Sequence, residues 1–207
     1  YGELEFANNL NKEEDSQINP KISSKNYKLI RNEEDIGIIL KNAEEKGELC
    51  IDTETTSLDP HQAKLVGISL STTIGNACYI PLGHKNYKNL EEVKILKLLK
   101  PILEDKSIKK IGQNIKFDFI MLFHRGINMN SMEDTMLMSY VLDAGKNRHN
   151  MDTLSELHLN HKPISFKDIV GSGKKEINFS EVDVNLAKNY AAEDLSLIHI
   201  SEPTRPL

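Results

Sequence analysis

The sequence contains no tryptophan and only two cysteines, Cys50 and Cys78, among its 207 residues. The two cysteines stand in separate apolar stretches without a Cys-x-x-Cys spacing. This pattern predicts buried, reduced thiols and argues against a disulfide framework or a cysteine metal site. No apolar run reaches the roughly 20 residues of a membrane-spanning helix, and the chain does not open on a signal-peptide pattern. We therefore expect a cytoplasmic protein without a membrane partner.

An excess of positive charge is also missing. The chain has 26 Lys and Arg against 31 Asp and Glu, a formal net charge of −5. This negative charge argues against electrostatic binding of nucleic acid over a broad surface. It leaves room for an acidic metal site that takes one strand end at a time. The hydrophobic fraction of 39% is that of a globular protein, and we expect a monomer with one folded domain.

Three segments are predicted along the chain. Residues 1–10 carry apolar side chains without a partner element, and 11–26 are polar. We interpret 1–26 as the end of an upstream region followed by a linker. The folded domain is predicted over 27–194. We expect 195–207 to be a non-native tail that interrupts the last helix and leaves it prone to fraying, because this segment carries two prolines and resembles a translated sequencing adapter.

Strands and helices alternate in the predicted domain. Strands are expected at 27–30, 48–54, 65–72, 77–82 and 110–112, and helices at 33–46, 90–103, 117–124, 134–142, 151–159 and 182–194. Residues 74–76 are typical of a hairpin turn. This order of elements predicts an α/β domain with a mixed sheet flanked by helices.

An acidic pair, Asp52 and Glu54, stands at the end of an apolar strand. Residues i and i+2 of a strand point to the same face, so the two carboxylates are predicted to project side by side. Neighbouring anions that lose hydration are costly unless a cation lies between them. A hard divalent ion, Mg²⁺ or Mn²⁺, suits oxygen ligands of this kind. An acidic turn that ends a strand is the ordinary alternative for the pair alone.

Two further acidic segments are candidates for the same site because of the elements in which they lie. Asp118 falls in the first turn of a predicted helix, where aspartate is common because it complements the helix dipole. Tyr190 and Asp194 are four residues apart and therefore share one face of the last helix. Taken singly, these residues also suit a cap and an ordinary helix surface.

Together, the segments around 52–54, 118 and 190–194 resemble, in order and type, the three motifs of the DEDD exonuclease superfamily. The resemblance is closest to the tyrosine subtype found in the proofreading domain of bacterial DNA polymerase I (family A), and it includes the strings LVGIS, YIPLGH and RHNMDTL. Asn189 stands where the histidine subtype has its histidine. The resemblance implies a ribonuclease H-like fold and 3′→5′ exonuclease activity. It also implies a single-stranded DNA 3′ end as substrate and a polymerase domain in cis.

The resemblance also implies roles for five residues. Asp52, Glu54, Asp118 and Asp194 would hold two divalent cations, Mg²⁺ or Mn²⁺. The first ion would be bound by Asp52, Glu54 and Asp194, and the second by Asp52 and Asp118. One ion would generate the attacking hydroxide and the other would stabilise the leaving oxygen. Tyr190 would orient the attacking water.

Contacts with DNA are implied for six residues: Thr55, Leu58, Asn114, Phe117, Arg148 and Phe166. Leu58 would wedge between the last two bases, Phe166 would pack on a base and Arg148 would meet a phosphate. For Leu58 and Phe166 an ordinary apolar role is equally well supported. Two alternatives stay open for the whole domain, a ribonuclease D-like RNA 3′ exonuclease and a non-catalytic DNA-guiding module.

Overall fold

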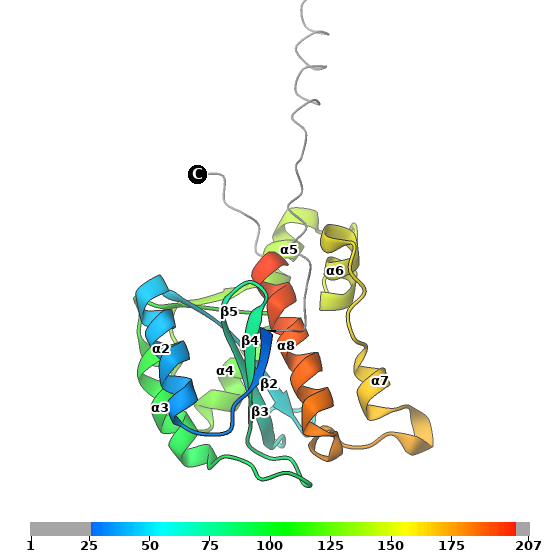
Figure 1. Cartoon of the computed structure of the whole chain (residues 1–207). Helices are drawn as coiled ribbons and strands as arrows, with labels where there is room; N and C mark the ends of the chain where they lie inside the picture. The colour runs from blue at the N-terminus through cyan, green and yellow to red at the C-terminus, as the bar shows by residue number, and fades with distance from the viewer. Residues whose placement is uncertain (1–25, 202–207) are drawn as a thin grey trace, which may run out of the picture.

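The computed structural model describes residues 26–201 and is drawn in Figure 1. Its strands are β1 (Tyr27–Leu29), β2 (Glu48–Thr55), β3 (Leu65–Thr73), β4 (Asn76–Pro81), β5 (Lys109–Gly112) and β6 (Met132–Asp134). Its helices are α2 (Glu34–Lys46), α3 (Glu92–Glu104), α4 (Lys116–Phe123), α5 (Thr135–Asp143), α6 (Met151–Leu159), α7 (Phe166–Val170) and α8 (Val184–Ser201), with 3-10 turns η2 (Gly173–Lys175) and η3 (Phe179–Glu181). The strands and helices predicted from the sequence are all present, with ends that differ by one or two residues except at the end of α8.

The six strands form one mixed sheet in the order β1-β4-β3-β2-β5-β6. β2, β3 and β4 are antiparallel neighbours, whereas β1 pairs with β4, β5 with β2 and β6 with β5 in parallel. The sheet confirms the predicted α/β class. β2 lies inside the sheet, with β3 on one side and β5 on the other. The strand that carries the acidic pair is therefore held along both edges by backbone hydrogen bonds.

Helices cover both faces of the sheet. α2 and α3 lie on one side and α8 crosses the other (Figure 1). On the α2–α3 side, buried apolar residues of the helices, such as Ile36 and Leu99, join strand residues in the largest core cluster. On the α8 side, Ala187, Ala191 and Ala192 are fully buried. These small side chains let the α8 backbone approach the sheet closely, which brings the acidic end of the helix toward β2.

The predicted end of the last helix at Asp194 is wrong, because α8 continues to Ser201. Leu195 and Ile198 are buried and pack with residues of the sheet that include Cys50 and Ile111. These apolar side chains continue the buried stripe of the helix, so the chain stays helical past the acidic motif. The interpretation of 195–207 as non-native stays a prediction.

Three further predictions concern the upstream segment, the two cysteines and membrane-spanning helices. Residues 1–25 lie outside the described residues, so the reading of 1–26 as an upstream end and linker stays a prediction. Cys50 and Cys78 are buried thiols, as predicted. Within 26–201, no helix has the length and apolar character needed to cross a membrane.

Candidate active site

A cavity of about 670 Å³ opens at the end of β2. Its lining includes the predicted site residues Asp52, Glu54, Thr55, Leu58, Phe166, Tyr190 and Asp194. β2 supplies the first three and α8 the last two, so residues more than 130 positions apart in the sequence meet here. Asn114, Phe117, Asp118 and Arg148 are not part of the lining.

Asp118 lies next to the lining residue Thr53, in the first turn of α4, and is 2% exposed. Its Oδ1 atom accepts hydrogen bonds from the backbone N–H of Thr53 at 2.8 Å and from Thr53 Oγ1 at 2.6 Å. Because Thr53 lies between Asp52 and Glu54, these two bonds join α4 to the acidic stretch of β2. Sequence reasoning did not single out Thr53, whose only signal is its place inside the acidic motif.

The four predicted carboxylates repel one another. Burial raises the pKa of Glu54 well above its usual range, and the charges of Asp52, Asp194 and Asp118 raise it further. Burial raises the pKa of Asp52 to about 7. The pKa values of Asp118 and Asp194 are raised by burial first and by the charge of Asp52 second. Each carboxylate therefore makes it harder for its neighbours to ionise.

The chemistry of this cluster suits a divalent cation. Glu54 Oε1 is buried without a hydrogen-bond partner, and such an atom is costly unless something binds it. Among the described residues, however, no three His, Cys, Asp or Glu side chains already converge on one point as metal ligands do. Two of the carboxylates instead accept hydrogen bonds, Asp118 from Thr53 and Asp194 from Tyr190. The donor set fits a cation, and protein donors hold Asp118 and Asp194 in place.

Tyr190 lies one helical turn before Asp194 on α8 and stands in an aromatic setting. Its ring centroid is 6.0 Å from that of Phe166 and 6.2 Å from that of Phe179. Burial raises the pKa of Tyr190, and the charges of Asp194, Glu54 and Asp52 raise it further. The phenol therefore keeps its proton and can act as a hydrogen-bond donor but not as a base.

The side chains expected to contact DNA differ in how they are placed. Leu58 is 94% exposed at the rim of the cavity. Phe166 is 44% exposed, and its other face stacks on Phe179 at an interplanar angle of 6°. Phe179, which sequence reasoning did not select, thus forms the inner wall behind Phe166. Leu58 and Phe166 both present apolar surface to the space above the carboxylates.

Of the other predicted contacts, Thr55 lines the cavity, whereas Asn114, Phe117 and Arg148 lie outside it. Thr55 Oγ1 donates to Ser57 O, inside the lining loop. Asn114 has a left-handed backbone, with φ of 55°, just before α4. Phe117 packs against the main core, and Arg148 is exposed between α5 and α6. DNA contacts for all six residues stay predictions.

The class of this domain follows from its sheet and its acids. The inner strand of a mixed sheet presents two carboxylates, and α4 and α8 each add one more. This is a ribonuclease H-like nuclease domain. Residues 27–200 match a family model described as 3′-5′ exonuclease, and the chain belongs to this family. The predicted resemblance is thereby confirmed, and the domain is an enzyme of the kind carried by DNA polymerase I.

Curated relatives and solved structures agree with this assignment. The chain is 45% identical to DNA polymerase I of Rhizobium leguminosarum over 75% of its length, and 37% identical to that of Pseudomonas aeruginosa over 94%. It spans 17% and 23% of these two relatives. Brucella melitensis NrnC with bound Mg²⁺ aligns with 26% identity and a TM-score of 0.59, covering 84% of this chain and 75% of NrnC. Trypanosoma brucei RNase D aligns over 84% of this chain and 62% of its own, with a TM-score of 0.65 at 14% identity, which shows the fold alone.

Proposed function

We propose that this domain hydrolyses the terminal phosphodiester of a single-stranded or frayed DNA 3′ end, as the proofreading part of a longer DNA polymerase I. The observation that carries the proposal is the group of four carboxylates, three that line one cavity and Asp118 hydrogen-bonded to Thr53, with Glu54 Oε1 buried and unpartnered. Identity to DNA polymerase I in several bacteria supports DNA over RNA as the substrate. The small share of each relative that the chain covers is consistent with a polymerase domain in cis.

Two divalent cations, Mg²⁺ or Mn²⁺, are the proposed cofactor. Asp52, Glu54 and Asp194 would hold one ion, and Asp52 with Asp118 the other. When bound, such ions supply Lewis acidity at the scissile phosphate and lower the pKa of an attacking water. The Mg²⁺ in the related NrnC structure supports a divalent ion in this family. The number of two rests on the four carboxylates that are available here.

The residues of the chain have separate tasks in this proposal. Tyr190 keeps its proton, so it orients an attacking water by donating a hydrogen bond rather than by removing a proton. Thr53 fixes Asp118 through two hydrogen bonds and so sets the position of the carboxylate that α4 contributes. Leu58 and the free face of Phe166 offer apolar surface to the terminal bases. Contacts of this kind do not depend on which bases are bound.

Digestion of a 5′-labelled single strand tests this function. DNA and RNA oligonucleotides of the same sequence are incubated with Mg²⁺ and the parent protein or its Asp118→Ala variant, with Asp168→Ala as a control. Asp168 is an exposed acid on α7. We expect a ladder that shortens from the 3′ end, faster on DNA, and its loss with EDTA and with Asp118→Ala only. Faster digestion of RNA would favour the ribonuclease D-like activity. No digestion by the parent would favour a non-catalytic DNA-guiding module.

A further inference from the structure

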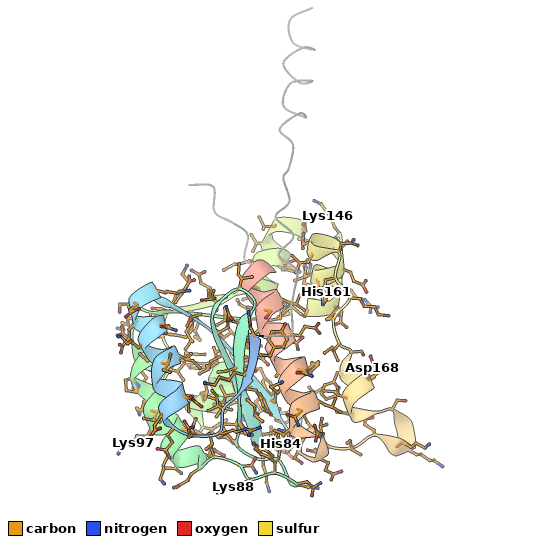
Figure 2. The ribbon with its side chains drawn as sticks, in the orientation of Figure 1. His84, Lys88, Lys97, Lys146, His161 and Asp168 are labelled. Atoms are coloured by element: carbon orange, nitrogen blue, oxygen red, sulfur yellow. The ribbon has the colours of Figure 1, made fainter. Side chains whose placement is uncertain are left out.

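A buried chain of hydrogen bonds runs beside the carboxylates, through Tyr79 on β4 and His84 in the loop that follows. Tyr79 Oη lies 2.8 Å from His84 Nε2, and His84 Nδ1 lies 3.1 Å from the carbonyl oxygen of Val182. Tyr79 is fully buried and His84 is 3% exposed. Figure 2 labels His84 near the end of the sheet where α8 begins. Val182 lies two residues before that helix, so these hydrogen bonds link β4 to the start of α8.

The direction of these hydrogen bonds follows from the acceptor at one end. A carbonyl oxygen can only accept, so His84 Nδ1 must carry the proton. Burial lowers the pKa of His84, which favours the neutral ring. In a neutral ring with a proton on Nδ1, Nε2 is an acceptor. Tyr79 must therefore donate its O–H to His84, so its one proton is not available to another acceptor.

Glu54 lies close to the Tyr79 hydroxyl. A Cβ atom at Gly67 would be 2.1 Å from Tyr79 Oη, so the hydroxyl occupies the place where a side chain at 67 would begin. Gly67 is the cross-strand partner of Glu54. Paired residues have Cβ atoms about 4.5–5.5 Å apart, which puts Tyr79 Oη within reach of the Glu54 carboxylate. Besides burial, the charges of Glu54 and Asp52 raise the pKa of Tyr79, in keeping with this closeness.

We propose that Tyr79 and His84 are positioning residues, and that His84 keeps the Tyr79 proton away from Glu54 so that this carboxylate stays free for a cation. Glu54 Oε1 has no hydrogen-bond partner although a phenol lies nearby, as this arrangement requires. If His84 could not accept, the Tyr79 proton would turn to the nearest anion and compete with the metal ion. The inference rests on the proposed function, because it assigns a task to residues around the same cation site.

The alternative is that His84 only anchors the start of α8 through Val182. Two substitutions separate these roles. The amide nitrogen of asparagine lies near the position of Nδ1, so His84→Asn retains a donor for Val182 and removes the acceptor for Tyr79. The amide of glutamine reaches the position of Nε2, so His84→Gln retains an acceptor for Tyr79. The positioning role predicts damage from asparagine, and the anchoring role predicts damage from glutamine.

Binding of Mn²⁺, followed by electron paramagnetic resonance without DNA, is the readout. We expect His84→Asn to weaken Mn²⁺ affinity about tenfold, and His84→Gln to stay within about twofold of the parent. Adding Tyr79→Phe to His84→Asn removes the competing proton and should restore the affinity to within about twofold. Asn89→Ala is the matched control, because the Asn89 side chain accepts from the backbone N–H of His84 and donates to its carbonyl oxygen, and so bonds the backbone of His84 instead of its ring. It is expected to lower the unfolding temperature and leave Mn²⁺ affinity unchanged.

The outcomes that overturn the inference differ from those that overturn the proposed function. Parent-like binding by His84→Asn, or a double variant as weak as His84→Asn, would refute the role of His84 alone. A parent that binds no Mn²⁺ would refute the proposed function and this inference with it. Should His84→Asn fail to fold, nitrogen-15 chemical shifts of the parent imidazole decide the matter. A proton on Nε2 would refute the inference, and a proton on Nδ1 would support it.

Discussion

Alanine at position 67 would place a methyl group where the hydroxyl of Tyr79 already lies. The added Cβ atom would be 2.1 Å from Tyr79 Oη and 2.3 Å from its Cζ. Carbon atoms in good contact are about 3.5–4.0 Å apart, so this overlap cannot be absorbed in place. Either the ring of Tyr79 moves or β3 and β4 separate. Tyr79 is fully buried, and the strands on both sides of it hold the ring in position.

The expected cost follows from these two ways to relieve the overlap. Overpacking of a closely packed core costs about 1–3 kcal/mol. If the ring moves, its O–H leaves His84 Nε2, and buried polar groups without partners cost about 1–3 kcal/mol. Burial of the new methyl group returns only about 0.8 kcal/mol. We therefore expect Gly67→Ala to lower the free energy of unfolding by about 2–4 kcal/mol.

Urea unfolding followed by circular dichroism measures this difference, and the same substitution elsewhere supplies its control. Gly37 lies in α2, is exposed, and a Cβ atom there would meet nothing within 4 Å. Gly37→Ala is expected to raise the free energy of unfolding by about 0.5–1 kcal/mol, because alanine favours the helix. The reasoning is refuted if Gly67→Ala unfolds within about 0.5 kcal/mol of the parent.

Three further predictions concern pH, the cavity rim and a buried lysine. The site carboxyl groups have a higher pKa in the folded protein than in the unfolded chain, where it is about 4. Their contribution to the stability of the metal-free protein is therefore complete below about pH 4 and is lost as the pH rises through about 7, the pKa of Asp52. The metal-free melting temperature should thus fall between about pH 5 and 7.5 and recover with Mg²⁺, and a rise without metal would contradict this. Leu58→Ala should change the free energy of unfolding by under about 0.5 kcal/mol but slow single-strand digestion about tenfold, and an unchanged rate would remove Leu58 from the binding surface. Lys110 is fully buried and donates to the carbonyls of Asp105 and Ile108, so Lys110→Met should cost about 1–3 kcal/mol in urea unfolding, and parent-like stability would show these bonds to be dispensable.

The longer elements of the fold were predictable because their apolar pattern is strong. β3 opens on the apolar run 65–68 and is buried along most of its length, and α3 repeats apolar residues at helical spacing. β6 and α7 have three and five residues, too few for a period to show, and both were missed. The end of α8 was misplaced because Pro203 and Pro206 suggested a stop, whereas buried Leu195 and Ile198 continue the helix.

The site could be predicted only in part, because local spacing does not show how distant segments pack together. Asp52 and Glu54 share a strand face and Tyr190 and Asp194 share a helix face, so local spacing already grouped each pair. That the pairs meet depends on how α8 crosses the sheet, which local sequence does not determine. The positions of Tyr79 and His84 behind Gly67 depend on strand register, so the sequence showed a resemblance there without a role.

Direct binding of Mn²⁺ to Asp52→Asn tests the central claim most closely, because Asp52 is the carboxylate assigned to both ions. Asp168→Asn, on the exposed side of α7 (Figure 2), controls for the loss of one negative charge. We predict that the parent and Asp168→Asn bind Mn²⁺ equally, and that Asp52→Asn remains folded but binds about 100-fold more weakly. Binding by Asp52→Asn as tight as that of the parent would contradict a cation site built on these carboxylates.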